Sequence, residues 1–241
     1  MTRSVIGRGP TACSSRSQPA LEQSAAPHPC RPDIIVRMAS DRDVVAFDRR
    51  AASYERDRHA GWHRQVTERM AGVVLATTPA PLRTLDVGCG TGALLRLLAA
   101  RLPEAVEPVG VDAARGMVTA GRSLPDLDPR IQFIQATAER LPFREASFDL
   151  VVSTTSFDHW ADQLQGLKEC ARMLRDDGRL VLADLFGDWL APTMVLGRRG
   201  RTRTTRQASR LLIAAGFRDL RWQRLYNLGP LPLVQAVIAA R

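Results

Sequence analysis

The order of apolar and polar positions predicts a helical N-terminal region followed by alternating strands and helices. From Asp41 to Leu75, apolar side chains recur at helical spacing, which indicates one or two amphipathic helices. The prolines of Thr78-Pro79-Ala80-Pro81 then end the helix. The predicted strands beyond it are Thr84 to Val87, Pro108 to Asp112, Ile131 to Thr137, Phe148 to Thr154, and Arg179 to Leu185, the last entered through the turn Asp176-Asp177-Gly178. The predicted helices between them are Gly92 to Leu102, Ala113 to Leu124 and Gln163 to Leu174.

Short strands that alternate with longer helices require crossover connections, so we predict a doubly wound α/β fold with a parallel sheet and helices on both faces. A later helix, Gln207 to Ala215, is predicted to end at Gly216. The last two apolar runs, Arg218 to Tyr226 and Leu233 to Ala239, are joined by Asn227-Leu228-Gly229-Pro230. This connection suits a hairpin and is too short for a parallel crossover. One strand of the pair must therefore run antiparallel to the sheet.

Composition separates an N-terminal tail from a globular remainder. The chain has 241 residues, of which 45% are hydrophobic and 24% are charged, and it has no apolar run long enough to span a membrane, so we expect a soluble protein. Proline, serine, alanine and glycine dominate from Thr2 to Pro32 without an apolar signal core, which predicts a disordered tail over residues 1–37. Met38 is an alternative start. A helical lid over residues 38–80 and a main domain over residues 81–241 complete the predicted organisation.

Cysteine and charge patterns add little chemistry. Four cysteines lack the spacing of a metal site or a disulfide framework, so no metal is expected and the cytoplasm fits best. They are Cys13, Cys30, Cys89 and Cys170. The net charge is +9, and its densest part is GRRGRTRTTRQASR, from Gly197 to Arg210. This stretch could meet an anion, although solvated arginines in a loop are the simpler interpretation.

Three glycines spaced two apart follow the first predicted strand, in Asp86-Val87-Gly88-Cys89-Gly90-Thr91-Gly92. Glycine lets the backbone turn sharply and approach a ligand, and we expect it to leave amide N–H groups free to bind that ligand. The spacing differs from the dinucleotide fingerprint Gly-x-Gly-x-x-Gly, and the Gly-Lys-Ser/Thr of a phosphate loop is missing. At the tip of the second strand, Asp112 can accept both hydroxyls of a ribose, and it can also cap the helix that begins at Ala113.

Four stretches resemble, in order, the motifs of small-molecule S-adenosylmethionine (SAM)-dependent methyltransferases, namely the type 11 family related to the ubiquinone and menaquinone biosynthesis methyltransferases. They are TLDVGCGTGALLRLLA, PVGVDAARGMVTAGR, ATAERLPFREASFDLVVS and LKECARMLRDDGRLVLADLF. The resemblance runs from about Asp41 to Phe186. It implies a class I, Rossmann-like methyltransferase fold with seven strands in the order 3-2-1-4-5-7-6 and strand 7 antiparallel, in agreement with the predicted hairpin. It also implies SAM as the cofactor and S-adenosylhomocysteine as the product.

The resemblance assigns roles to individual residues. Asp86 and Gly88 would face the methionine part of SAM, and Gly90 would close the loop beneath it. Asp112 would hold the ribose hydroxyls, and Met117 would lie near the adenine. The other cofactor-binding positions implied are Cys89, Ser153, Thr154 and, for a tyrosine that covers the methionine end, Tyr54.

One motif departs from the family pattern. Relatives usually have an acidic residue that accepts a hydrogen bond from the adenine amino group, where this chain has Thr137. A neutral acceptor is weaker than a carboxylate. The backbone at Ala138 and Glu139 could compensate.

Methyl transfer from SAM depends more on how the two reactants are aligned than on catalytic side chains. Methyl transfer from a sulfonium is an in-line displacement, so the protein mainly aligns the acceptor and excludes water. A base matters only if the acceptor must lose a proton. His159 follows the fourth strand at its carboxyl end and is the best candidate for a base or an acceptor-orienting group, although it could equally bind the cofactor or cap a helix. His59 and His63 in the lid are weaker candidates.

A segment near residues 187–206 is expected to form a substrate cap. Its apolar half could line a pocket for a lipophilic acceptor, pack on the sheet, or pack on a second subunit in a homodimer; these residues are Trp189, Leu190, Met194, Val195 and Leu196. The chain lacks a stacking array of aromatic residues, which disfavours a nucleic-acid substrate. We therefore expect methylation of a small lipophilic or secondary-metabolite acceptor.

Two alternatives stay open. One is an NAD-dependent oxidoreductase, which the glycine spacing and the absence of a Tyr-x-x-x-Lys pair disfavour. The other is a non-enzymatic regulator or nucleic-acid-binding module that acts through the arginines of Gly197 to Arg210.

Overall fold

The computed structural model describes residues 42–56, 60–78, 83–104, 106–187 and 203–241. The expected tail, His59 and most of the expected substrate cap, including its apolar half, lie outside the described residues. The N-terminal region forms α1 (Arg42–Arg50), the 3-10 helix η2 (Ala51–Arg56) and α2 (Ala60–Thr77). No helix in the described part of the chain is both long and apolar enough to cross a membrane.

Seven strands form one sheet in the order β3-β2-β1-β4-β5-β7-β6, which confirms the predicted order. The strands are β1 (Arg83–Val87), β2 (Glu107–Asp112), β3 (Gln132–Gln135), β4 (Phe148–Thr154), β5 (Leu174–Asp184), β6 (Arg218–Leu228) and β7 (Leu231–Ala240). β1 to β5 pair in parallel, whereas β7 is antiparallel to both of its neighbours, as predicted. The carboxyl ends of β1, β2 and β4 therefore meet at one edge of the sheet, where ligands bind in open α/β folds.

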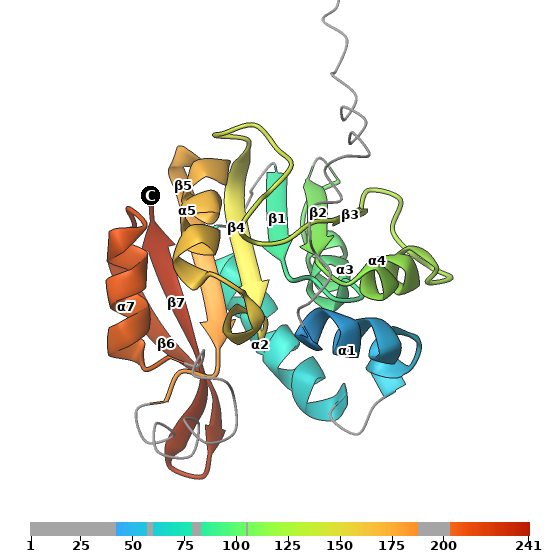
Figure 1. The fold of residues 1–241 in the computed structure, drawn as a ribbon, viewed down its shortest axis with the longest axis horizontal. Coiled ribbons are helices and arrows are strands. Elements are labelled where there is room, and N and C mark those ends of the chain that lie inside the picture. Colours follow the sequence, from blue (N-terminus) through green and yellow to red (C-terminus); the bar gives the residue numbers. More distant parts are fainter. Residues whose placement is uncertain (1–41, 57–59, 79–82, 105, 188–202) are drawn as a thin grey trace, which may run out of the picture. The chain divides into compact units, whose positions relative to one another are not determined.

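Helices cover both faces of this sheet (Figure 1). The helices are α3 (Ala93–Ala99), α4 (Arg115–Arg122), the 3-10 helix η3 (Phe157–His159), α5 (Gln163–Met173) and α7 (Thr205–Ala214). α5 and α7 pack on one face, and α2 and α3 on the other, each over its own apolar cluster. Because both faces are buried, the central strands are apolar along most of their length, as in β4.

The start of β5 corrects one prediction. Asp176-Asp177-Gly178 was expected to be a turn before the strand, but the strand already begins at Leu174. The pairing jumps from Phe148 opposite Leu174 to Leu150 opposite Arg179. The intervening residues therefore bulge out of the ladder, which is how a turn-forming sequence is accommodated at the edge of a strand.

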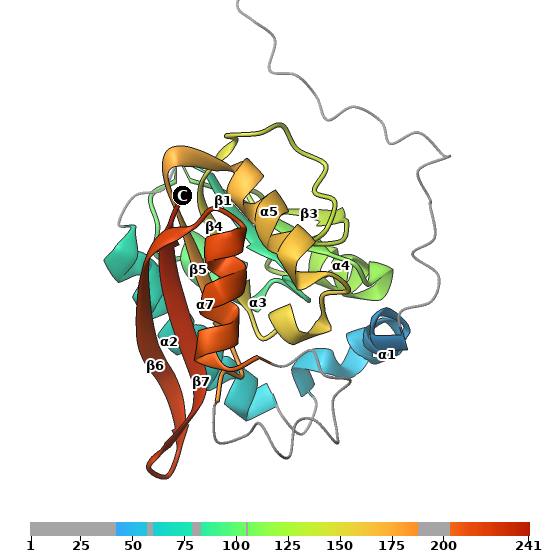
Figure 2. The same cartoon turned by 60° about the vertical axis from the view of Figure 1, so that its left-hand side comes forward.

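The C-terminal hairpin forms as predicted, and α7 lies beside it, against the face of the sheet (Figure 2). α7 begins with a capping box, in which Thr204 and Gln207 satisfy each other's backbone N–H groups. It ends before Gly216, whose φ of +97° is costly for other residues. Trp222 on β6 donates from its indole Nε1 to Ser209 Oγ at 3.1 Å, which ties the hairpin to α7.

Candidate functional site

The glycine loop, residues 86–92, joins β1 to α3 at the carboxyl edge of the sheet. Gly88 has a φ of +76°, and a Cβ there would lie 2.3 Å from Ser156 Oγ. Only glycine fits such a position. Gly90 has a φ of +55°, but its missing Cβ would meet only Tyr54 Cε1, at 3.8 Å. The surface over Gly90 is therefore the part of the loop that a ligand can approach, beneath Tyr54.

The amide groups of the loop correct a second prediction, because the protein itself uses them. Gly88 and Cys89 both donate to the carbonyl of Val111, at 2.8 and 3.0 Å. Gly90 donates to Asp112 Oδ2 at 2.8 Å. A phosphate-binding loop needs such amides free for the anion. This loop is therefore fastened to the end of β2 and offers no phosphate cradle.

Asp112 connects the glycine loop to α4. Its Oδ2 accepts from Gly90, and its Oδ1 accepts from the N–H of Ala114 at 2.8 Å, so it also supports the turn into α4. Burial raises the pKa of its carboxyl above the ordinary value, although the two backbone donors oppose the shift. Each carboxylate oxygen has a second lone pair. Asp112 can therefore still accept hydroxyl donors from a ligand.

Asp86 is the most unusual polar group of the loop. It is 2% exposed, and its Oδ1 has no hydrogen-bond partner among the residues that the structure describes. Burial, and then the charge of Asp112, raise the pKa of Asp86 to about 8. A buried oxygen without a partner is costly and suits a ligand that brings a donor or a positive charge. The ammonium and sulfonium groups of SAM fit this requirement.

The helical lid contacts the same edge of the sheet. Asp48 on α1 accepts from the N–H of Gly116 at 2.6 Å, at the start of α4. Glu55 accepts from Thr91 Oγ1 at 3.0 Å and pairs with Arg96 at 2.5 Å. Met117 is 1% exposed and packs in an apolar cluster with the lid residue Ala51 and with Ala114. The lid is thus fastened to both α3 and α4.

The remaining cofactor positions implied by the family differ in how they are placed. Cys89 is buried, and its side chain packs against β2, because a Cβ on Gly110 would lie 2.7 Å from its Sγ. Burial also raises the pKa of the Cys89 thiol well above its usual range. Ser153 Oγ lies 2.8 Å from Ser156 Oγ, while the buried Thr154 Oγ1 has no hydrogen-bond partner within the described ranges.

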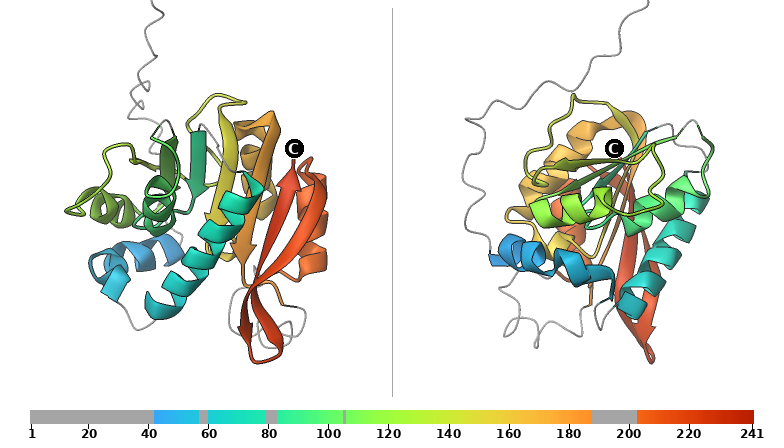
Figure 3. Two further views of the ribbon diagram at one scale, coloured as in Figure 1. Left: turned by 180° about the vertical axis from the view of Figure 1, so that it is seen from behind. Right: turned by 90° about the vertical axis from the view of Figure 1, so that its right-hand side faces the viewer.

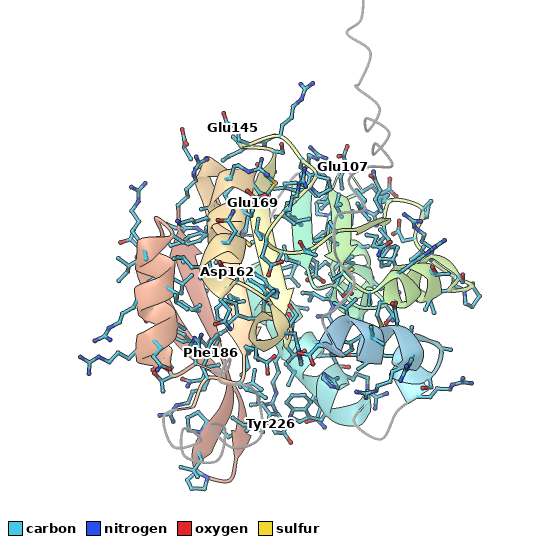
Figure 4. The ribbon with its side chains drawn as sticks, viewed as in Figure 1. Glu107, Glu145, Asp162, Glu169, Phe186 and Tyr226 are labelled. Carbon is cyan, nitrogen blue, oxygen red and sulfur yellow. The ribbon has the colours of Figure 1, made fainter. Side chains whose placement is uncertain are left out.

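The third motif lies between β3 and α5. Thr137 forms an isolated bridge with Arg140 and is half-buried, while Ala138 is 6% exposed. Glu139 Oε1 accepts from the N–H of Asp162 at 3.1 Å, just before α5. Figure 4 labels Asp162 at this position. The carboxylate of Glu139 therefore supports a helix start.

His159 lies between two carboxylates. Its Nδ1 is 3.3 Å from Asp43 Oδ2 on α1, and its Nε2 is 3.3 Å from Asp158 Oδ1. Its ring also stands edge-on to Phe47, with centroids 5.0 Å apart. In this arrangement His159 bridges the lid and the loop after β4. His63 packs instead against Trp62 and Tyr54, within the lid.

Sequence reasoning missed one acidic residue, which lies beside Asp158. Asp184, at the end of β5, is 2% exposed and accepts from the N–H of Asp158 at 3.2 Å. Burial, and then the charge of Asp158, raise the pKa of Asp184 to about 8. An acidic residue that ends an apolar strand was the available signal. Thr155, directly after β4, is a β-branched residue held at a φ of +53°, a strained conformation.

Comparison with known proteins identifies the family. A family model described as a methyltransferase domain matches residues 85–182. The chain is 39% identical over 189 residues to the malonyl-acyl-carrier-protein O-methyltransferase of Geobacter sulfurreducens, covering 73% of this chain and 69% of that protein. The chain belongs to the SAM-dependent methyltransferases. This confirms the predicted enzyme class and its cofactor, SAM.

A second relative matches less of the chain. This chain is 38% identical to the ubiquinone/menaquinone biosynthesis C-methyltransferase UbiE of Geotalea uraniireducens, over 42% of this chain and 45% of that protein. A solved SAM-dependent methyltransferase from Thermotoga maritima superposes with a TM-score of 0.62 at 21% identity, covering 80% of this chain and 97% of that one. This structural likeness confirms that the chain has the predicted class I methyltransferase fold.

Proposed function

We propose that this methyltransferase transfers the methyl group of SAM to a small-molecule acceptor, lipophilic or of the secondary-metabolite type, over the glycine loop. The observation that supports the site most strongly is Asp86, whose buried Oδ1 has no hydrogen-bond partner in the described part of the chain. The occupied loop amides add to this, because they disfavour the pyrophosphate of a dinucleotide in the same place.

In the proposed site, each end of SAM has its own residues. Asp86 receives the positive methionine end, Gly88 and Gly90 form the floor, and Tyr54 covers it. Asp112 holds the ribose hydroxyls through its remaining lone pairs. The adenine lies by Met117 and by the backbone of the third motif. The further contacts proposed are Cys89 (backbone), Thr137, Ala138, Glu139, Ser153 and Thr154.

When bound, SAM supplies a methyl group on a sulfonium, which a nucleophile can take directly. The residues of this chain hold the acceptor in line and exclude water. Names of relatives point to two kinds of acceptor: a malonyl group on a carrier protein, methylated on oxygen, and a quinone precursor, methylated on carbon. A carboxylate needs no base, whereas a carbon or a phenol must lose a proton.

His159 is the proposed proton acceptor or acceptor-orienting group. It stands beside Asp158 and beneath α1, at the carboxyl edge of β4. Its bridge to Asp43 keeps one ring nitrogen turned to the lid, so accepting a proton there requires the lid contact to open. A rate of transfer that is flat with pH and insensitive to His159→Asn favours a carboxylate acceptor instead.

Ligand binding tests the site directly. Titration calorimetry and thermal unfolding with SAM, S-adenosylhomocysteine and NAD are expected to show binding and stabilisation by the first two alone. Asp112→Asn is expected to weaken SAM binding by about tenfold or more, since a charged acceptor becomes a neutral one. Asp126→Asn, an exposed aspartate beyond α4, is the matched control. Stabilisation by NAD alone, or equal losses in both variants, would refute the proposed site.

A further inference from the structure

A hollow of about 620 Å³ lies between the second half of α2 and the outer strands of the sheet. None of its lining residues belongs to the glycine loop. Figure 3 (left) shows α2 crossing in front of the sheet, with β7 and β6 beside it. We call this hollow the arginine groove, because Arg69, Arg179, Arg221 and Arg224 line it with one acidic residue, Asp219.

The floor of the arginine groove is apolar. Gly72 and Ala76 on α2 line it with almost no side chain, and nothing lies within 4 Å of the position that a Cβ on Gly72 would take. Val73, Leu225 and the half-buried Ile238 on β7 add apolar surface, and the polar residues Thr77 and Gln223 also line the groove. The hollow therefore exists because α2 presents small residues where it faces the outer strands.

Strand register brings two arginines to this face. Arg221 on β6 pairs with Ile238, and Ile238 pairs with Val181 on β5. Residues that pair directly across strands point to the same face, so Arg221 shares the face of Val181. Arg179 lies two residues before Val181, so Arg179 and Arg221 point to the same face of the sheet. That face is the one covered by α2, because Val181 belongs to the apolar cluster beneath α2. Guanidinium groups from two strands thus border one floor.

Most of this charge is uncompensated. Arg69 Nη1 donates to the carbonyl of Leu225 at 2.6 Å, and its guanidinium lies 5.4 Å from the ring centroid of Tyr226, labelled in Figure 4. Arg179, Arg221 and Arg224 have no hydrogen-bond or ion-pair partner among the described residues. Gathering like charges around a hollow is unfavourable unless an anion enters it.

We propose that the arginine groove binds a small molecule that carries two or more phosphate groups on an apolar body. Guanidinium groups bind phosphate through paired N–H donors, and a phosphate ester brings close to two negative charges. Several guanidinium groups bordering one floor match several phosphates, while Gly72, Val73 and Ile238 receive the apolar part. The groove and the glycine loop share no residue, so we expect binding here to leave SAM affinity unchanged.

The dimensions favour a small molecule over a macromolecule. The volume lies within the range of about 300–1,000 Å³ typical of small-molecule pockets. A stable protein partner would need about 800 Å² on each side. None of the residues that line the groove is aromatic, so it has no platform on which nucleic-acid bases could stack.

Titration with sodium pyrophosphate and tripolyphosphate, at constant ionic strength, tests the proposal. Calorimetry on the full chain is expected to show saturable binding, tighter for either probe than for inorganic phosphate. The double variant Arg179→Ala/Arg221→Ala is expected to weaken binding by about tenfold or more. Arg101→Ala/Arg144→Ala, which removes two exposed arginines outside the groove, is expected to leave it unchanged.

Three outcomes overturn the proposal: no binding of either probe at millimolar concentration, equal loss in both double variants, or binding only to a short single-stranded RNA or an acidic peptide. SAM titration of the same variants separates this proposal from the methyltransferase site. If the Arg179→Ala/Arg221→Ala variant loses pyrophosphate binding while its SAM affinity is unchanged, the result supports an anion site that is separate from the methyltransferase site. Loss of SAM affinity in the groove variant would contradict the independence of the two sites.

Discussion

In the glycine loop, the backbone groups that face the end of β2 are already bonded within the protein, whereas in the arginine groove three charged side chains have no partner among the described residues. The loop is built from neighbouring residues of the chain. The groove is assembled from α2, β5 and the hairpin of β6 and β7, which are distant in sequence. The first is held by hydrogen bonds and tight packing, whereas the second carries like charges over an apolar floor.

This difference implies different responses to change. A packed, bonded loop tolerates little alteration of shape, and its affinity for a ligand depends on the few groups left over, chiefly Asp86 and Asp112. An exposed cluster of like charges tolerates substitution but responds to salt. The two regions should therefore respond differently to substitutions that change the shape of the loop, to the protonation of its buried carboxyls, and to ionic strength.

The largest effect is expected from Gly88→Ala. A Cβ there meets Ser156 Oγ at 2.3 Å, and the φ of +76° is strained for alanine, so unfolding free energy should fall by about 2–4 kcal/mol. Gly90→Ala, with only Tyr54 at 3.8 Å, should cost about 1 kcal/mol and act mainly on SAM affinity. Urea unfolding and SAM titration measure both. Equal loss of stability in the two variants would contradict the assignment of Gly90 to the ligand side.

A second effect follows from the raised pKa values of Asp86 and Asp184, each about 8 against an ordinary value of 3.8. At a pH between these two pKa values, each of these carboxyls keeps its proton in the folded chain and has lost it in the unfolded chain. This contribution to stability is therefore complete below about pH 4 and is lost as the pH rises through 8. Asp86→Asn or Asp184→Asn should flatten the decline of unfolding free energy between about pH 5 and 8, by up to about 1.4 kcal/mol per pH unit.

SAM distinguishes the two carboxyls. Its positive charge should favour the ionised form of Asp86, so saturating SAM should flatten the pH dependence in the wild type and in Asp184→Asn, but not in Asp86→Asn. Urea unfolding across this pH range, with and without SAM, measures the effect. If SAM changes the slope equally in all three proteins, Asp86 does not face the cofactor.

Much of the fold could be predicted because its determinants are local. β4 was predicted with its observed bounds, since an apolar run between polar residues marks a buried strand. The hairpin followed from the short Asn227 to Pro230 connection, which cannot cross over. The bulge at Asp176 to Gly178 was missed because it depends on the register with β4, which the residues of β5 do not encode alone.

The candidate site was predictable only in its outline. The glycine spacing marked the loop, but that its amides are bonded to Val111 and Asp112 depends on the position of β2. Likewise, Asp184 meets Asp158 only because β4 and β5 are neighbours. The arginine groove was not anticipated, because nothing in the local sequence relates Arg69, Arg179 and Arg221.

A smaller effect is expected at the contact between the lid and the glycine-loop edge. Asp43→Asn removes the carboxylate that faces His159 Nδ1 at 3.3 Å. Since this pair is partly exposed, the loss should be about 0.2–1 kcal/mol, seen as faster amide exchange of α1 and up to about fivefold weaker SAM binding. Asp162→Asn, which keeps a cap at α5, is the control. Unchanged α1 exchange would show that Asp43 does not hold the lid.

The smallest expected effect tests the electrostatic character of the arginine groove without any ligand. Arg221→Ala removes one of the three groove charges that have no partner among the described residues, so it should raise the melting temperature by about 1 °C or less at low ionic strength. Screening shortens the reach of such repulsion to about 3 Å at 1 M salt, so the gain should vanish there. Arg101→Ala should show no salt-dependent gain. A gain that persists in high salt would mean that Arg221 strains the packing of β6 rather than repelling its neighbours, and the groove would then lack the unfavourable charge that an anion relieves.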